Sequence, residues 1–469
     1  MSARIYGQVL FLMAHAPLGM LAYNRPQVSM VHAFLTLALG LMWALVGDSR
    51  PHRVAYVAAY IVGGEVLWRM TGAPIPWEFG KYAMVTVMVA WMIQNGRLKA
   101  PLAASLYFAF LLPSIVLTLV GVDLFLARQE ISFALSGALA VLVAVGFFTQ
   151  IQLSDPQRRQ LYVSLLAPLV SIAAITVTAT LLNPDITFGT ESSVEASGGF
   201  GPNQVSAALG LGAMLAVLAL TEPAAPWGFK PAMLACALLF TAQSAFTFSR
   251  GGLLTAGISA LLGSLHLLSD SRARFRTLAT AAGLGLLAAY LVFPALNAFT
   301  DGALANRFQD TGLTNRDSIA SADIQIWQEN LIFGVGPGQA NVHREKFYRN
   351  TASHTEYSRM VAEHGLFGLV AFASLMVMVF QIIRKPRPVS QKALTMALSA
   401  WALLFMVSYG MRLAAPAFAL GLAALPQGAA LVPVLRQYSP FRAGVTARAG
   451  GRLLAGVSGG ARKTSVHVP

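Results

Sequence analysis

A succession of long apolar runs constrains this chain more than any other feature. A helix that spans a bilayer needs about 20 mostly apolar residues, and fourteen runs of roughly that length follow one another along the sequence. They lie at about 5–22, 29–46, 54–70, 79–95, 101–123, 131–149, 161–182, 203–221, 231–248, 252–269, 277–297, 365–383, 393–410 and 413–435. The pairs that flank Arg250 and Arg412 are closely spaced, so twelve or thirteen spans also fit. The pattern predicts an all-α polytopic membrane protein with about 12–14 transmembrane helices.

The composition excludes a soluble fold. Only 11% of the 469 residues are charged and 56% are hydrophobic, whereas soluble domains carry about 25% charged residues. A net charge of +14 would suggest nucleic-acid binding in a soluble chain, but too few charges are present here to build such a surface. Cys236 is the single cysteine and lies in an apolar run, which excludes a disulfide framework and a cysteine-based metal site.

The distribution of basic residues predicts the orientation in the membrane. If the N-terminus is cytoplasmic, the segments on that side hold 21 of the 33 basic residues, and the short segments on the other side hold six. Both termini are therefore expected inside. The expected domains are transmembrane helices over 1–297, an outward-facing segment with short helices over 298–364 that covers the site, further transmembrane helices over 365–435, and a basic, disordered cytoplasmic tail over 436–469.

The end of the outward-facing segment contains a candidate general base. Ser353 and Glu356 have the spacing of a capping box, which predicts a helix start at about 353. His354 would then lie in the first turn of a helix that continues into the membrane. A histidine with the ordinary pKa of about 6.5 can accept a proton near neutral pH. The alternative is an interfacial histidine that is bonded to a loop carbonyl.

Arg250 is the second candidate, because it stands alone between two apolar runs in FTFSRGGLLTAG. A charged residue inside a bilayer is costly and is functional by default. Gly251 and Gly252 would leave backbone room for a ligand beside the guanidinium, and arginine holds phosphate oxygens in a bidentate fork. The alternative is an arginine that snorkels to the interface.

A short amphipathic helix is predicted between Arg316 and Trp327. Arg316 would begin this helix, near backbone N–H groups that attract anions, and Arg307 is an alternative on the same stretch. Either residue could instead be a solvated loop charge. The FGVGPGQ stretch at 333–339 resembles a phosphate cradle only loosely, and its proline and lack of a following Lys-Ser/Thr indicate a tight turn.

Several catalytic motifs are absent from the sequence. It contains no D-x-D, no G-x-S-x-G and no Walker motif. The three outer histidines, His343, His354 and His364, are about ten residues apart, which is not a metal-ligand spacing. Chemistry on the outer face is therefore expected to depend on arginines, a histidine and the leaving group of the substrate, with no metal.

Three motifs in order resemble one known family. They are S-R-G-G at 249–252, N-R-D with I-W and L-I-F-G-V-G-P-G between 315 and 338, and S-H-T-E-Y-S-R-M-V-A-E-H-G-L-F-G at 353–368. From about 200 to 385 the chain closely resembles the O-antigen ligase family, which also includes O-antigen and exopolysaccharide polymerases. The first 200 residues match only as a succession of spans.

The resemblance implies a metal-independent, membrane-embedded glycosyltransferase of the GT-C type, with about twelve helices and no cofactor. It would lie in the bacterial inner membrane with its active site facing the periplasm. The donor would be a glycan on undecaprenyl pyrophosphate. The acceptor would be lipid A–core in a ligase or another lipid-linked glycan in a polymerase, and nucleic acid is not an expected partner.

The resemblance also implies the site residues. The key histidine of the family falls on His354, and its two key arginines fall on Arg250 and on Arg316 or Arg307. Thr355 replaces the asparagine that usually follows the histidine. Substrate contacts are predicted at Arg307, Gly251, Gly252, Tyr357 and Arg359. The arginines would stabilise the departing pyrophosphate, and His354 would take the proton of the acceptor hydroxyl, with inversion at the anomeric carbon.

Two rival functions stay open on the sequence. A polymerase of the same family uses the same donor, so sequence does not separate it from a ligase. A secondary transporter would need ionisable residues near mid-membrane and broken helices at matching places in two halves. The mid-span ionisable residues are few, chiefly His15, Glu65 and His266, which makes the transporter the weaker alternative.

Overall fold

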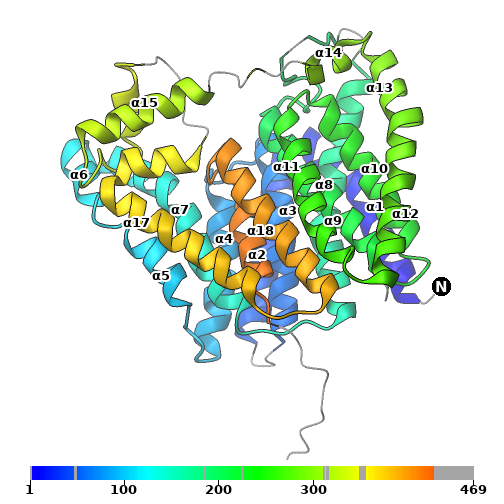
Figure 1. The fold of residues 1–469 in the computed structure, drawn as a ribbon, viewed down its shortest axis with the longest axis horizontal. Coiled ribbons are helices and arrows are strands. Elements are labelled where there is room, and N and C mark those ends of the chain that lie inside the picture. Colours follow the sequence, from blue (N-terminus) through cyan, green and yellow to red (C-terminus); the bar gives the residue numbers. More distant parts are fainter. Residues whose placement is uncertain are drawn as a thin grey trace, which may run out of the picture. The chain divides into compact units, whose positions relative to one another are not determined.

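Helices account for 78% of the residues that the structure describes, and this part of the chain contains no strand, so the all-α prediction is confirmed (Figure 1). The structure is a computed structural model that describes residues 3–46, 50–183, 186–189, 191–222, 225–309, 312, 316–347 and 355–426. Residues 1–428 form one compact unit. The predicted cytoplasmic tail at 436–469 lies outside the described residues.

The long helices form one bundle, and the short helices interrupt or flank it. The long ones are α1 (Ala3–Asn24), α2 (Pro26–Leu45), α3 (Pro51–Met70), α4 (Phe79–Gln94), α7 (Leu124–Phe148), α8 (Asp155–Leu181), α9 (Pro202–Thr221), α10 (Lys230–Phe246), α11 (Arg250–Leu267), α12 (Ser271–Leu287), α17 (Glu356–Arg384) and α18 (Val389–Tyr409). The short ones are α5 (Leu102–Ala109), α6 (Ile115–Gly121), the π-helical η1 (Ala288–Val292), α13 (Phe293–Phe299), α14 (Ala303–Gln309), α15 (Arg316–Glu329), α16 (Ala340–Arg344) and α19 (Ala415–Ala423).

Most of the predicted spans coincide with helices. Within the described residues, eight helices are long and apolar enough to cross a membrane. The run at 101–123 was wrongly predicted as one span, because the chain turns between α5 and α6. Pro113 lies in that turn and has no N–H group to continue a helix. The run at 413–435 begins with the nine-residue α19, and its part from 427 onward lies outside the described residues.

The bundle is packed through small residues. α3 contacts α2, α4, α8 and α9 and is buried over most of its length. A Cβ at Gly63 of α3 would collide with the Leu165 carbonyl of α8, and a Cβ at Gly210 of α9 would lie 2.6 Å from the Gly252 carbonyl oxygen of α11. Glycine therefore allows the backbones to approach closely, as is usual between membrane helices.

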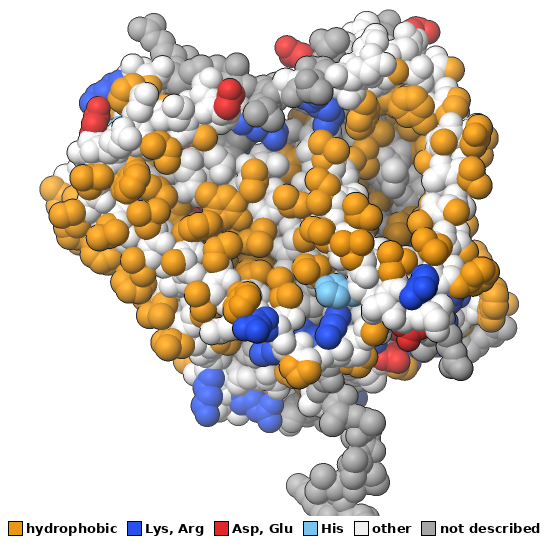
Figure 2. Space-filling view, viewed as in Figure 1, with side chains coloured by type: hydrophobic (Ala, Val, Ile, Leu, Met, Phe, Trp, Pro, Cys, Tyr) orange, Lys and Arg blue, Asp and Glu red, His pale blue; other side chains and the backbone are white. Residues whose placement is uncertain are grey.

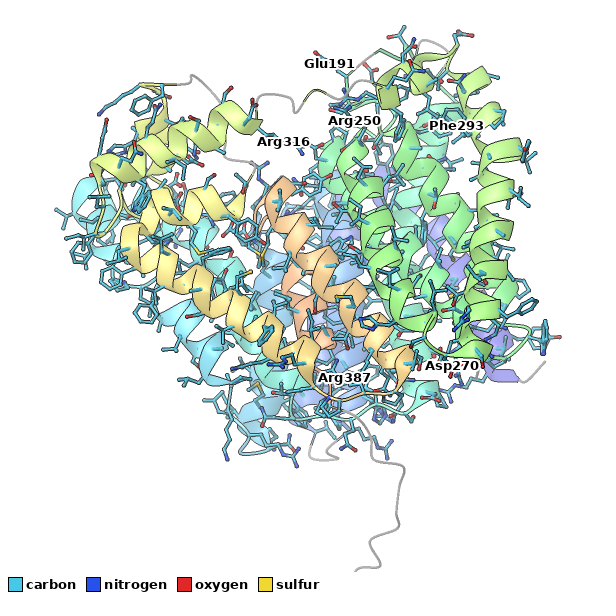
Figure 3. All side chains as sticks on the ribbon, in the orientation of Figure 1. Glu191, Arg250, Asp270, Phe293, Arg316 and Arg387 are labelled. Atoms are coloured by element: carbon cyan, nitrogen blue, oxygen red, sulfur yellow. The ribbon has the colours of Figure 1, made fainter. Side chains whose placement is uncertain are left out.

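The two ends of the bundle carry the polar side chains. Figure 2 shows hydrophobic side chains across the middle of the visible face, with basic side chains gathered toward the two edges. Figure 3 places Arg250 and Arg316 at one edge, and Asp270 and Arg387 at the opposite one. We call the edge with Arg250 and Arg316 the outer side. The short helices α14 and α15 lie there (Figure 1).

Candidate active site

The first turn of α11 presents Arg250 on the outer side. Ser249 is the N-cap of this helix and has an extended backbone (φ −90°, ψ 101°). Its hydroxyl donates a hydrogen bond to Oδ1 of Asn203 at 2.7 Å, which fixes the start of α11 against α9. Arg250 follows as the first helical residue, and its Nη2 donates to the carbonyl of Gly312 at 2.8 Å.

The two glycines after Arg250 are required by packing. A Cβ at Gly251 would collide with the hydroxyl of Tyr409, and a Cβ at Gly252 would collide with the backbone of Ser206. The room that the sequence analysis assigned to a ligand is therefore occupied by protein beside both Cα atoms. A direct contact of either glycine with substrate stays a prediction.

Tyr409 connects the start of α11 with the start of α15. It is the last residue of α18 and is 2% exposed. The Cζ atom of Arg316 lies 5.8 Å from the centroid of the Tyr409 ring, a cation–π distance, and the Tyr409 hydroxyl lies against Gly251. Arg316 begins α15 as predicted, and Ile319 is buried on that helix. Tyr409 thus brings the helix starts that carry Arg250 and Arg316 to one place.

Arg307 binds the backbone of the turn that precedes Arg250. It lies in α14, is 7% exposed, and its Nε donates to the carbonyl of Phe248 at 2.9 Å. Phe248 has a positive φ of 56° in the turn before Arg250, so this bond stabilises the turn. Of the two candidates for the second key arginine, Arg316 is the one that contacts Tyr409. The assignment itself stays a prediction.

The predicted general base precedes α17. The helix begins at Glu356, and its N-cap Thr355 has an extended backbone (φ −107°, ψ 127°) with no capping bond from its side chain. The predicted start at about 353 is therefore wrong by three residues, because the chain is still extended at Thr355. His354 and Ser353 lie outside the described residues, and the role of His354 stays a prediction.

Tyr357 and Arg359, predicted as substrate contacts, both have protein partners. The Tyr357 hydroxyl donates to the Leu403 carbonyl of α18 at 3.0 Å. Arg359 forms ion pairs with Glu356 at 2.5 Å and with Glu363 at 2.7 Å. These contacts give both residues a structural role at the start of α17, and their contact with substrate stays a prediction.

α17 bends at Gly365. The glycine-rich stretch at 333–339 and the two residues before it form backbone hydrogen bonds to the chain around this bend. Gly365 has φ 59° and ψ −135°, a conformation that essentially only glycine adopts. The N–H of Leu366 donates to the carbonyl of Leu331 at 2.8 Å, and the N–H of Gly336 donates to the carbonyl of Glu363 at 2.9 Å. All three glycines of FGVGPGQ have positive φ, so the stretch forms the tight turn predicted from the sequence. The bend falls at the predicted boundary of the membrane span.

Substitution of Gly365 by alanine should destabilise this region strongly. The left-handed backbone costs an ordinary residue about 1–3 kcal/mol, and the new Cβ would lie 2.6 Å from Gly334 N and from the Ile332 carbonyl. We expect a lower thermal unfolding midpoint in detergent. Gly283→Ala is the matched control, because a Cβ there meets nothing within 4 Å. Equal midpoints for the two variants would contradict this role of Gly365.

A buried ion pair joins the outer short helices to α17. Nη2 and Nε of Arg344 in α16 donate to Oδ1 of Asp323 in α15 at 2.6 and 2.9 Å. The Ser358 hydroxyl of α17 donates to Oδ2 of the same carboxylate at 2.6 Å. Both charged side chains are fully buried. No local sequence pattern relates these positions, so the pair was not predictable from the sequence.

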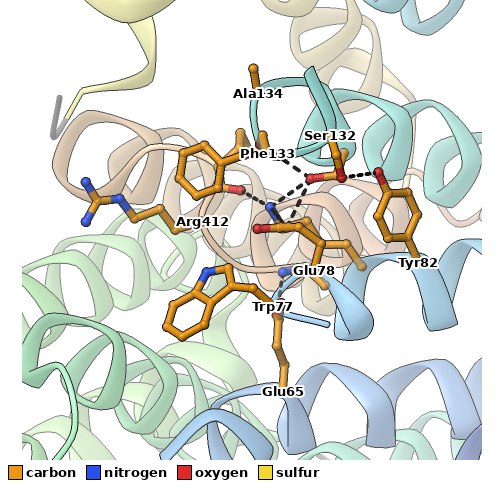
Figure 4. Close-up of polar contacts among 12 residues, drawn as sticks. Glu65, Trp77, Glu78, Tyr82, Ser132, Phe133, Ala134 and Arg412 are labelled. Carbon is orange, nitrogen blue, oxygen red and sulfur yellow. Dashed lines mark hydrogen bonds and ion pairs between the residues drawn. The ribbon is translucent and has the colours of Figure 1, made fainter. Parts of the chain in front are cut away.

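The turn after α18 contains a further arginine on the outer side, Arg412. In the sequence Arg412 marks a boundary between two apolar runs, and it stands alone between them as Arg250 does. Charged side chains of α3, α4 and α17 bind the backbone of this turn, and Figure 4 shows the surroundings of Glu65, Glu78 and Arg412. The bonds join Glu356 Oε2 to Met411 N at 3.0 Å, Lys81 Nζ to Met411 O at 2.8 Å, Arg69 Nη1 to Arg412 O at 2.9 Å, and Glu65 Oε2 to Ala414 N at 2.7 Å. Within the described ranges, no group of three or more His, Cys, Asp or Glu side chains is placed to hold a metal ion.

Comparison with known proteins identifies the part of the chain that contains these residues. The model of the O-antigen ligase family matches residues 232–373, from α10 into α17. This segment is similar to the O-antigen ligase family. The resemblance seen in the sequence is thereby confirmed, and all three of its motifs lie inside the match. No curated protein and no solved structure matched the chain.

Members of the O-antigen ligase family are membrane ligases and polymerases, which supports an enzymatic role. Their substrates are, in general terms, a lipid-linked glycan and an acceptor. The long apolar helices agree with a multi-pass membrane protein. Arg250, Arg307, Arg316 and the position of His354 all fall within the matched segment, whereas Arg412 follows it.

Proposed function

We propose that this protein transfers a glycan from undecaprenyl pyrophosphate to a hydroxyl group of lipid A–core at the periplasmic face of the bacterial inner membrane. One observation carries the proposal. Within the segment that matches the O-antigen ligase family, the helix starts of Arg250 and Arg316 meet at Tyr409 on one side of the bundle. Arginine suits phosphate oxygens because its fork binds two of them at once and stays charged.

The reaction is a single displacement without a metal, in a site of the GT-C type. The acceptor oxygen attacks the anomeric carbon and forms the new glycosidic bond, while the bond from that carbon to the phosphate oxygen breaks. The electron pair of the broken bond leaves with the lipid pyrophosphate. His354 takes the proton of the acceptor hydroxyl, and Arg250 and Arg316 stabilise the negative charge on the phosphates. Displacement from the opposite face inverts the anomeric carbon.

The orientation follows from the same side chains. Arg250 and Arg316 lie at the edge opposite Asp270 and Arg387 (Figure 3). The excess of basic residues on the cytoplasmic segments predicts that the edge of Arg387 faces the cytoplasm. The outer side would then face the periplasm, where the sugar of a flipped lipid-linked donor emerges.

Loss of the gene tests the choice between ligase and polymerase, since both use the same donor. A deletion strain should accumulate lipid A–core without attached polymer, while polymer stays on the lipid carrier. Extraction of the lipid-linked intermediates and their separation by size would show this directly. Accumulation of single repeat units would instead identify a polymerase, and an unchanged pattern of glycolipids would contradict both activities.

The pH dependence of transfer should show one essential base. A histidine is neutral above its pKa of about 6.5 and protonated below it, and only the neutral form accepts the acceptor proton. Transfer should therefore fall below about pH 6, by roughly tenfold for each pH unit. The measurement is kcat/KM between pH 5 and 8, with thermal stability followed over the same range. A flat profile in protein that remains folded would contradict a histidine base.

A further inference from the structure

The turn that carries Arg412 is bound by several charged side chains. Gly410 precedes it with φ 62° and ψ −166°, a backbone that favours glycine. Three of the four side chains that bind the turn, Glu65, Lys81 and Glu356, are at most 3% exposed. Bonds from ionised groups to backbone atoms are stronger than neutral ones. The backbone from 411 to 414 is therefore fixed in position.

The side chains that bind the turn are themselves joined by ion pairs and hydrogen bonds. Glu65 pairs with Arg69 at 2.8 Å, and Lys81 pairs with Glu78. The Ser136 hydroxyl donates to Glu78 Oε2 at 3.1 Å and receives a bond from Lys81 Nζ at 3.0 Å. Such buried networks of charges are costly to assemble and hold one geometry once complete.

The Arg412 guanidinium extends away from the hydrogen-bonded groups around Ser132 and Tyr82, as Figure 4 shows. Burial lowers the pKa of Arg412, and the Arg359 guanidinium lowers it further; Arg316 and Arg69 contribute in the same direction, and Glu356 in the opposite one. Arg412 follows Tyr409 by three residues, and the Cζ atom of Arg316 lies 5.8 Å from the centroid of the Tyr409 ring. Neighbouring guanidinium groups repel one another, and a bound anion between them reduces this repulsion and stabilises their charged forms.

We propose that Arg412 is a third anion-binding arginine, which acts with Arg250 and Arg316 on the pyrophosphate of the donor. Tyr409 ends the helix before the Arg412 turn, and it contacts both Arg316 and the start of α11. The turn thus lies beside the place where the two helix starts meet. This inference rests on the proposed function, and it adds a residue outside the segment that matches the family.

The charge change during transfer gives Arg412 a specific role. The lipid-linked donor carries one negative charge on each phosphate. When the bond to the anomeric carbon breaks, its electron pair stays on the terminal phosphate, which becomes able to carry a second charge. A rigidly held third arginine would stabilise this additional charge in the transition state more than it stabilises the bound donor. It would therefore raise kcat more than it lowers KM.

The test compares Arg412→Ala and Arg412→Lys with Arg128→Ala in purified full-length protein that transfers glycan from the lipid-linked donor. Arg128 is an exposed arginine of α7, so it controls for the loss of one charge. Arg412→Ala should lower kcat by about 10²–10³-fold and change the KM for donor by less than about threefold. Arg412→Lys should recover part of kcat, and Arg128→Ala should match the unmodified protein.

Inorganic pyrophosphate provides a second readout, because it resembles the leaving group. The inhibition constant of pyrophosphate should rise at least about tenfold in Arg412→Lys. This variant keeps the positive charge at position 412 and is expected to fold. Unchanged kcat in folded Arg412→Ala, or unchanged inhibition in Arg412→Lys, would overturn the proposal. A lower unfolding midpoint with normal turnover per folded molecule would also overturn it, since Arg412 would then only balance the buried carboxylates. If the unmodified protein transferred nothing from the lipid pyrophosphate, the proposed function itself would fail.

Discussion

Replacement of His354 by alanine should abolish glycan transfer while the protein remains folded and inserted. A general base contributes about 10²–10⁴-fold to rate, and no other titratable group is proposed to take the acceptor proton. We therefore expect kcat to fall by at least about 10³-fold, with little change in the KM for donor. The reason is that the lost interaction is made as the acceptor oxygen attacks, after the donor has bound. Transfer would be measured in purified protein with a defined lipid-linked glycan.

His343→Ala is the matched control for this variant. His343 lies in the same outer segment, in α16, and its Nδ1 lies 3.1 Å from the carbonyl of Gln339 in its own helix turn. It should retain normal transfer. Normal transfer by His354→Ala, with protein levels equal to those of His343→Ala, would contradict the assignment of the base.

Replacement of Arg250 by lysine should impair transfer severely although the positive charge is kept. A lysine ammonium meets phosphate as a point charge and cannot form the two parallel bonds of a guanidinium. We expect a loss of about 10²-fold in kcat/KM, comparable to the removal of one transition-state donor. Because Arg250 also donates to the Gly312 carbonyl, the thermal midpoint of the variant must be compared with that of the unmodified protein.

Arg128→Lys separates the loss of the fork from a general effect of replacing arginine. Arg128 is exposed, and its guanidinium lies 5.4 Å from the ring centroid of Phe125. We expect this control to be neutral. If Arg250→Lys transferred as well as Arg128→Lys, bidentate binding of the pyrophosphate by Arg250 would be excluded.

The helices were predictable where a single local property determines them. Runs of about 20 apolar residues marked most of the spans, and the amphipathic pattern after Arg316 marked α15. The prediction failed where one residue overrides the pattern. Pro113 lies in the turn that divides the run at 101–123, and the extended backbone of Thr355 delays the start of α17 to Glu356. Hydropathy averages over a window, so it does not detect such single positions.

The candidate site was predictable only in part, for a related reason. The Glu65–Arg69 pair follows from helical spacing and is present at 2.8 Å. The second oxygen of the same carboxylate binds the amide of Ala414, far along the chain, and no sequence periodicity relates the two. The role of Tyr409 was not predictable for the same reason, because it depends on contacts with Gly251 and Arg316 from other helices. Motifs predict candidate residues, and tertiary packing determines which of them meet.

The most direct test of the proposed reaction is transfer by the purified full-length protein in proteoliposomes that contain EDTA, an undecaprenyl-pyrophosphate glycan and lipid A–core. We predict that the glycan moves to the acceptor without a divalent metal ion and that the anomeric configuration of the new bond is inverted. Both are read from the isolated product by mass spectrometry and NMR. Transfer that requires added metal, or that retains the anomeric configuration, would contradict a single displacement driven by arginines and a histidine base.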